Sequence, residues 1–232
     1  GGAAGTVTDA WFATVAGCRL NTASGTSSTV AGGRLNTASG TSSTVAGGYN
    51  SSAGGLYATV GGGFQNTSTG HSAAVGGGYS NSASGTYATV AGGLSNVASG
   101  SYGATVGGGR NNTSGYYATV AGGGFYTSGN YASVGGGWIN TANGSFSAVP
   151  GGNDNSAAGD YSFAAGRRAK IDATHDGTFL FADQTNADFN SAAANEFAAR
   201  ATGGVRLITN TGGTTGAVLA AGAVGDLGPG AE

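Results

Sequence analysis

A valine followed closely by glycines recurs along most of this chain at a spacing of about 15 residues. The anchors are Val15, Val30, Val45, Val60, Val75, Val90, Val106, Val120, Val134 and Val149, and Ala164 closes the series. Helical repeats run to about 33–47 residues, so a period this short is instead typical of one coil of a β-solenoid. The repeat therefore predicts a rod, and rods usually hold, present or bind.

The composition excludes several other classes of protein. The 232 residues include 50 glycines without a period of three, which rules out a collagen triple helix. Disorder is disfavoured because an unfolded linker has no reason to keep its valine and alanine columns in phase. Charged residues make up 8% of the chain and the net charge is −2, so no binding of nucleic acid is indicated. No apolar run reaches the roughly 18 residues of a membrane helix, so we expect no membrane insertion.

The coil that begins at Val75 shows the pattern within one period. In the stretch from Tyr87 to Val90, strand alternation places Ala88 and Val90 on one dry face, and Tyr87 and Thr89 on the other. Another column of small residues follows eight positions after each valine. Glycine is expected at both corners, where it reaches positive φ without steric cost. Asparagines six positions after the valines are predicted to occupy corners and to form a ladder of stacked amides: Asn21, Asn36, Asn66, Asn81, Asn96, Asn112, Asn140 and Asn155.

The interior of such a coil is thin. Two short strands per coil, stacked about 4.8 Å apart, would build a flat roll about 50 Å long over ten coils. Each coil buries about one valine and two alanine-sized groups, whereas ordering the backbone costs about 1–2 kcal/mol per residue. Neighbouring coils and other copies of the chain must supply the remaining stabilisation, and we therefore predict a homotrimer.

Two stretches carry a resemblance to known families. The unit from Tyr87 to Gly93, continued from Asn96 to Gly100, resembles the head repeats of YadA-like trimeric autotransporter adhesins. The stretches 161–170, 175–183 and 203–207 look like the segment that precedes an endosialidase-type intramolecular chaperone in fibre proteins. The resemblance implies a trimeric left-handed parallel β-roll. It also implies that a chaperone would follow Glu232 and be cleaved off after assembly.

The resemblance and the repeat together divide the chain into three parts. We expect a lead-in over residues 1–12, β-roll repeats over residues 13–164, and a C-terminal, β-rich trimerisation segment over residues 165–232. The predicted fold class is therefore all-β, a left-handed parallel β-roll or solenoid of 15-residue coils, as a homotrimer.

The repeats lack the residues that catalysis requires. Between Asp9 and Asp154 there is no Asp or Glu, so a pair of carboxylates for glycoside hydrolysis cannot form there, and a Ser–His–Asp triad lacks its acid. We predict no catalytic residue, no metal site and no cofactor. Acids gather later, from Asp172 to Glu196, beside His175 and the basic residues Arg167, Arg168 and Lys170. Salt bridges that fix the register between chains explain this cluster more simply than a hydrolase site at a trimer interface.

Two columns of large side chains are candidates for binding. Four positions after the valines, the candidate ligand-binding residues are Arg19, Arg34, Tyr49, Phe64, Tyr79 and Trp138, with Leu94 and Arg110 in the same column. Tyr, Trp and Arg are enriched at binding interfaces. The second column holds Tyr57, Tyr87, Tyr117, Tyr131, Phe146 and Tyr161. Stacking between coils or packing between chains is the alternative explanation for either column.

The sequence favours a non-enzymatic trimeric fibre, extracellular, on a cell surface or on a virion, that presents a binding surface to a cell-surface glycan or a protein receptor. The alternatives are a filament that self-associates end to end, a tailspike-like polysaccharide depolymerase, and an ice-binding solenoid. Outward threonines such as Thr29, Thr44 and Thr59 favour the last of these, but bulky tyrosines alternating with them along the strand argue against a flat threonine plane.

Overall fold

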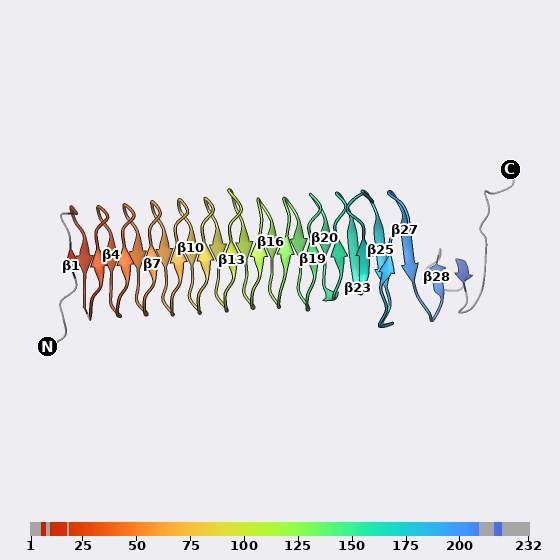
Figure 1. The fold of residues 1–232 in the computed structure, drawn as a ribbon, viewed down its shortest axis with the longest axis horizontal. Helices are drawn as coiled ribbons and strands as arrows, with labels where there is room; N and C mark the ends of the chain where they lie inside the picture. Colours follow the sequence, from red (N-terminus) through yellow and green to blue (C-terminus); the bar gives the residue numbers. More distant parts are fainter. Residues whose placement is uncertain (1–5, 8–9, 18, 209–215, 220–232) are drawn as a thin grey trace.

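The computed structural model describes residues 6–7, 10–17, 19–208 and 216–219, and Figure 1 shows them as a long stack of coils. Within those ranges every regular element is a β-strand and none is a helix. The strands are parallel from coil to coil, so the predicted β-solenoid is confirmed. No helix suited to crossing a membrane occurs in the described ranges.

Each coil contributes one strand to each of two parallel sheets. The 13-stranded sheet contains β1 (Thr6–Val7), β3 (Thr22–Ala23), β5 (Thr37–Ala38), β7 (Ser52–Ala53), β9 (Thr67–Ser68), β11 (Ser82–Ala83), β13 (Val97–Ala98), β15 (Thr113–Ser114), β17 (Thr127–Ser128), β19 (Thr141–Ala142), β22 (Ser156–Ala157), β24 (Ala169–Ile171) and β26 (Phe189–Asn190).

The 14-stranded sheet contains β2 (Thr14–Val15), β4 (Thr29–Val30), β6 (Thr44–Val45), β8 (Thr59–Val60), β10 (Ala74–Val75), β12 (Thr89–Val90), β14 (Thr105–Val106), β16 (Thr119–Val120), β18 (Ser133–Val134), β20 (Ala148–Val149), β21 (Gly152–Asn153), β23 (Phe163–Arg167), β25 (Phe179–Ala182) and β27 (Phe197–Arg200). The register pairs each anchor valine with the next: Val75 faces Val60 on one side and Val90 on the other.

The core is a dry double column between the two sheets. From Val30 to Val149 every anchor valine is at most 1% exposed. The facing column of Ala38, Ala53 and their equivalents is also buried, with serine at three positions. Ala88 and Val90 are fully buried and Thr89 points outward, as the alternation predicts. Tyr87 is different, because it has φ +58° and precedes β12, so it lies at a corner rather than in the strand.

The corners depart from the sequence-based expectation in two ways. Positive φ does occur at one recurring corner glycine, as at Gly48 (φ +94°), but not at the recurring glycine of the other corner, which includes Gly40. There Gly40 is buried, and a Cβ on it would overlap the carbonyl oxygen of Gly55 in the next coil, so close approach explains this glycine. At that corner the residue in the left-handed conformation is Ser42 (φ +54°). At the asparagine corner it is the residue immediately before the asparagine, such as Leu35 (φ +60°). The asparagines of the column are not among the residues with positive φ, so the tolerance of Asn for the left-handed region does not explain their recurrence.

The asparagines form a buried ladder of a different kind from stacked amides. Nδ2 of Asn81 donates to the carbonyl oxygens of Gly77 (2.8 Å) and Gly93 (2.9 Å), and its Oδ1 accepts the backbone N–H of Asn96 (2.9 Å). Asn81 is 1% exposed. Each asparagine thus satisfies backbone groups of its own coil and of the next, which a buried corner requires. In two coils the same position holds Ser51 or Tyr126.

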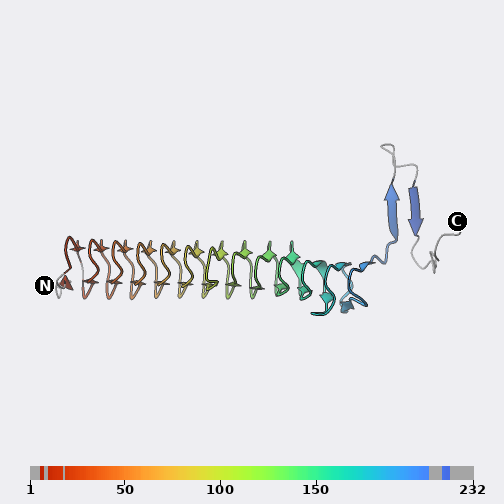
Figure 2. The ribbon, with the colours of Figure 1, turned by 90° about the horizontal axis from the view of Figure 1, so that it is seen from above.

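The two sheets continue beyond the expected boundary at residue 164, which falls inside β23. Strands there lengthen to 5 residues in β23 and 4 in β25 and β27. After β27 the chain leaves the stack and forms an antiparallel pair, β28 (Val205–Ile208) with β29 (Gly216–Leu219), which Figure 2 shows apart from the coils.

Candidate functional site: an arginine–aromatic column

All six candidate binding residues lie in one column along the solenoid. Successive members are joined by single parallel bridges, which run from Arg19 through Arg34, Tyr49, Phe64, Tyr79, Leu94, Arg110, Gly124 and Trp138 to Asn153. We call Arg19, Arg34, Tyr49, Phe64, Tyr79, Leu94, Arg110 and Trp138 the Arg34 column. Every member except Arg19, which follows Cys18, comes directly after a glycine with positive φ, so the side chain projects from the coil edge. Arg19, Arg34, Tyr79, Arg110 and Trp138 are exposed, while Tyr49 and Phe64 are half-buried.

The aromatic members stack on one another. The ring centroids of Tyr49 and Phe64 are 5.0 Å apart with planes 11° apart, and those of Phe64 and Tyr79 are 4.9 Å and 7° apart. Since each ring covers the face of the next, the column presents mainly ring edges to solvent. This geometry fits cross-coil stacking, and it leaves little free ring face for a sugar or a base.

Arginines sit at the ends of the aromatic runs. The Cζ of Arg34 lies over the ring of Tyr49, 5.6 Å from its centroid, and Arg110 lies at 5.6 Å over Phe125. Such a cation–π contact holds a guanidinium in place while leaving its N–H donors free for an oxyanion. Among the described residues, no carboxylate lies within ion-pair distance of Arg19, Arg34 or Arg110.

Sequence reasoning missed one member of this surface. The coil between Val120 and Val134 is 14 residues long and has Gly124 at the column position. Phe125, the next residue, takes the left-handed conformation (φ +61°) and packs edge-on against Trp138 at 5.1 Å. The missing residue falls after Ser128, at the opposite corner, so it leaves the column position unchanged. The available signal was instead the large aromatic residue directly after Gly124.

The second aromatic column lies at the other corner and is more exposed. Rings follow one another from Tyr57 to Tyr161, and the last steps are closely stacked, with Tyr131 to Phe146 at 4.7 Å and Phe146 to Tyr161 at 5.2 Å. The structure adds His71, Tyr102 and Tyr116 to the predicted members. Its members in the left-handed conformation are strained for bulky residues, and strain of this kind often marks a functional contact.

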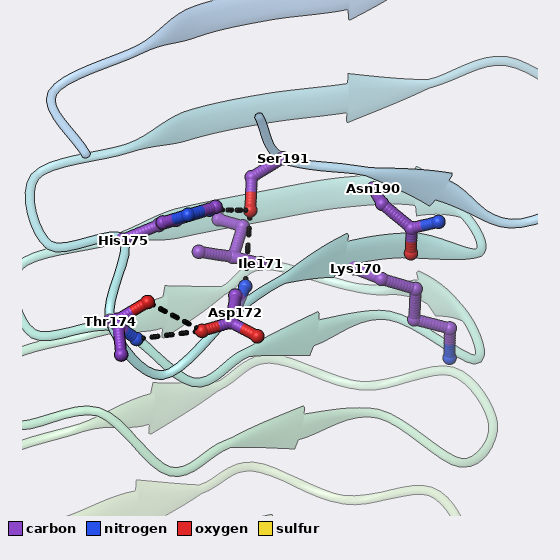
Figure 3. Close-up of a pocket in the computed structure, with 7 residues that line it drawn as sticks. All are labelled: Lys170, Ile171, Asp172, Thr174, His175, Asn190 and Ser191. Atoms are coloured by element: carbon purple, nitrogen blue, oxygen red, sulfur yellow. Dashed lines mark hydrogen bonds between the residues drawn. The ribbon is translucent and has the colours of Figure 1, made fainter. Parts of the chain in front are cut away.

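A pocket in the described residues lies among the C-terminal coils. It is a hollow of about 430 Å³ lined by Lys170, Ile171, Asp172, Thr174, His175, Asn190 and Ser191. Figure 3 shows His175, Thr174 and Asp172 at one end of it, and Lys170 and Asn190 at the other.

Ser191 connects the polar groups of this pocket. Its Oγ lies 2.6 Å from Nδ1 of His175 and accepts the backbone N–H of Asp172 at 3.1 Å. Hydrogen bonds from the backbone and hydroxyl of Thr174 lower the pKa of the Asp172 carboxyl. In the described part of the chain no carboxylate accepts a hydrogen bond from His175, so a Ser–His–Asp triad is not assembled. The pocket offers hydrogen bonds to a small polar ligand.

The late acidic cluster pairs within one chain, across successive coils. Asp154 accepts Lys170 (2.6 Å) and Arg168 (3.4 Å), and Asp183 accepts Nε of Arg200 at 3.1 Å. The backbone and hydroxyl of Thr202 hold the pKa of Asp183 well below its usual range. These ion pairs join successive coils of one chain, and salt bridges between chains stay a prediction. Among the described residues no group of three or more His, Cys, Asp and Glu side chains is placed to hold a metal ion.

A scan of the chain against models of protein families found no match, and a search of curated proteins found no similar sequence. The likeness to adhesin heads and to the segment before an endosialidase-type chaperone thus remains a prediction from the residues alone.

Proposed function

We propose that this chain is the shaft or head of a non-enzymatic, trimeric fibre, extracellular, on a cell surface or on a virion, that presents the Arg34 column as a binding surface. The observation that carries the proposal is the contrast between a uniform interior and a chemically varied exposed column that contains all the arginines of residues 10–153. A packing column repeats one residue type, as the valines do, whereas the Arg34 column changes from coil to coil. Solenoids commonly use such variation on a regular scaffold for extended recognition.

The trimer is supported by the outer faces of the sheets. In the repeats the outward residues of the 14-stranded sheet are small and uncharged, as in Thr44 and Ala46 or Thr59 and Gly61. A smooth face of this kind loses little side-chain entropy when it packs against an identical face. The family resemblance points to the same assembly, as a left-handed roll with 15-residue coils.

Sedimentation velocity combined with light scattering tests the assembly. The expected mass is three times 21.9 kDa, with a frictional ratio well above that of a compact sphere. A stable monomer at micromolar concentration would contradict the proposal.

The depolymerase alternative receives no support from the described carboxylates. Asp154, Asp183 and Asp188 are engaged in ion pairs, and Asp176 accepts the backbone N–H of Asp160. We expect no release of reducing ends from capsular or cell-wall polysaccharides. Release that is abolished by Asp176→Asn or Asp183→Asn would establish a hydrolase instead.

An ice-binding surface is a second candidate, because one observation favours it. The outward threonines of β4, β6 and β8 are in register, Thr29 with Thr44 and Thr44 with Thr59. Tyrosines such as Tyr57 lie at the corner and not in the strand, so the objection that they alternate with threonine along the strand is wrong. Thermal hysteresis with faceted ice crystals would support this function. Its loss on Thr44→Tyr, with an unchanged melting temperature, would locate the ice-binding face.

A further inference from the structure

The charge of the repeats is confined to a single column. From residue 10 to residue 153 the only Asp, Glu, Lys or Arg residues are Arg19, Arg34 and Arg110. All three are exposed and all three belong to the Arg34 column. A roll with about 15 residues per coil offers many other surface positions, and none of them carries a charge in this range. The three arginines therefore form one line of positive charge along an otherwise uncharged shaft.

Two of these arginines are direct neighbours. Arg19 and Arg34 are partners in a parallel bridge between adjacent coils, so their backbones are about 4.8 Å apart. Like charges directly opposite each other on neighbouring strands destabilise a sheet. Within the described residues no carboxylate is placed to offset this repulsion. An external oxyanion between the two guanidinium groups would remove it.

The aromatic neighbours prepare the guanidinium groups for such a ligand. Arg34 rests over Tyr49 and Arg110 over Phe125, each 5.6 Å from the ring centroid. A guanidinium held on a ring loses less freedom when it binds, and its planar set of donors matches the two oxygens of a carboxylate or a sulfate. The cation–π contact thus holds the guanidinium group in place, and its planar donors favour a carboxylate or a sulfate as the ligand.

We infer that the Arg34 column binds an acidic polysaccharide, whose carboxylate or sulfate groups pair with Arg19, Arg34 and Arg110 while the chain lies along the shaft. This rests on the proposed function and names its ligand class. Arg34 and Arg110 are five coils apart, about 24 Å at the usual strand spacing, so one extended polyanion spans both.

Nucleic acid fits this surface less well. The net charge of the chain is −2 and the column supplies three cations, whereas nucleic-acid surfaces carry dense positive charge. Single strands also need free aromatic faces for their bases, and the rings of Tyr49, Phe64 and Tyr79 are stacked on one another.

The test uses the intact 232-residue chain and three polysaccharides, of which dextran sulfate and dextran share one backbone. Binding to dextran sulfate, to alginate and to uncharged dextran is measured by biolayer interferometry at low and high salt. We expect binding to dextran sulfate or alginate that weakens with salt, and none to dextran. Dextran sulfate and alginate distinguish sulfate from carboxylate as the preferred group. Binding to all three alike would overturn the inference, as would tighter binding of a single-stranded oligonucleotide of equal charge.

Variants locate the site. Arg34→Gln combined with Arg110→Gln should weaken binding about tenfold or more, since each contact is a charge-assisted hydrogen bond. The matched control is Arg167→Gln, which removes a charge from the C-terminal coils, where that guanidinium bonds the carbonyl of Gln184. Equal losses in both proteins would overturn the inference. Mass and melting temperature are recorded for every variant. A trimer that binds no polyanion contradicts this inference alone, whereas a monomer contradicts the proposed function.

Discussion

The repeats before Asp154 and the coils after it belong to the same two sheets, but different interactions hold them. In the repeats the strands are two residues long, and buried asparagine side chains connect one coil to the next. In the C-terminal coils strands such as β23 and β25 lengthen, and ion pairs such as Arg168 with Asp188 (2.8 Å) connect coils beyond Asn155, which still accepts the backbone N–H of Ala169 at 3.0 Å. Stacked phenylalanines also join those coils, with Phe163 to Phe179 at 4.6 Å and Phe179 to Phe197 at 4.8 Å.

This difference separates two ways of making a solenoid. An amide ladder is uncharged and repeats without limit, so the shaft can have any number of coils and stays insensitive to pH and salt. Ion pairs depend on pH, and they form only between particular coils because their residues do not repeat. They therefore suit the end of a shaft, where no further identical coil is added. The predictions below test this comparison, beginning with the largest expected effect.

The valine column of the repeats should not tolerate charge. Val90→Asp places a carboxylate in a fully buried position with no partner, and we expect a loss of more than about 4 kcal/mol of stability. Thermal melting followed by circular dichroism measures the effect. Thr89→Asp, at the neighbouring exposed position, is the control and should melt within a few degrees of the wild type. Equal melting of the two variants would mean that the valines do not face inward.

The corner glycine Gly40 should be required for stability, whereas Gly47, two residues after Val45, should be replaceable. A Cβ at Gly40 would overlap the carbonyl oxygen of Gly55, whereas a Cβ at Gly47 would meet nothing within 4 Å. Gly40→Ala should therefore cost about 3 kcal/mol, and Gly47→Ala should cost close to nothing. Urea titration of both variants measures the difference. Equal midpoints would show that the coils are more loosely stacked than described.

The asparagine ladder can be weakened in a graded way. Asn81→Ala leaves the backbone N–H of Asn96 and the carbonyl of Gly77 without the asparagine partner and removes one of two hydrogen bonds to the carbonyl of Gly93, which should cost about 2 kcal/mol. Asn81→Ser should cost less, because Ser51 already occupies this column and its Oγ accepts the N–H of Asn66 at 3.2 Å. If alanine and serine variants unfold at the same urea concentration, the side-chain oxygen does not contribute.

Lowering the pH should destabilise the C-terminal coils and leave the stability of the repeats unchanged. Hydrogen bonds from Thr202 and Thr185 lower the pKa of Asp183, so its contribution to stability is present above the ordinary aspartate pKa of about 4 and is lost as the pH falls below it. Residues 10–153 contain no carboxylate and should not respond. Asp183→Asn should remove part of this pH dependence at the C-terminal end. Melting profiles recorded on either side of pH 4 by fluorescence would detect it, and an unchanged pH dependence would assign the acid effect to other carboxylates.

The sequence predicted the parts of the fold that depend on regular spacing. The valine and alanine columns, their dry faces and the solenoid followed from periodicity and strand alternation. The left-handed corners did not, because residues as different as Leu35, Ser42 and Tyr57 occupy them and give no common signal. The candidate column was found in full except for Phe125, which follows Gly124 and so lies one position after the regular spacing. The pocket at Ser191 joins residues 16 apart in a region without a repeat, so periodicity gave no means of finding it.

Residue-resolved hydrogen exchange on the intact assembly tests the central claim most directly, namely that one continuous ladder holds the shaft. The backbone amides of Asn36, Asn81 and Asn96 donate to asparagine oxygens of the preceding coil. We predict that they exchange as slowly as the strand amides of Thr29 and Thr44, and that acid leaves this protection unchanged while it falls in β25 and β27. Rapid exchange of the asparagine amides, or equal loss of protection in both regions in acid, would contradict the account.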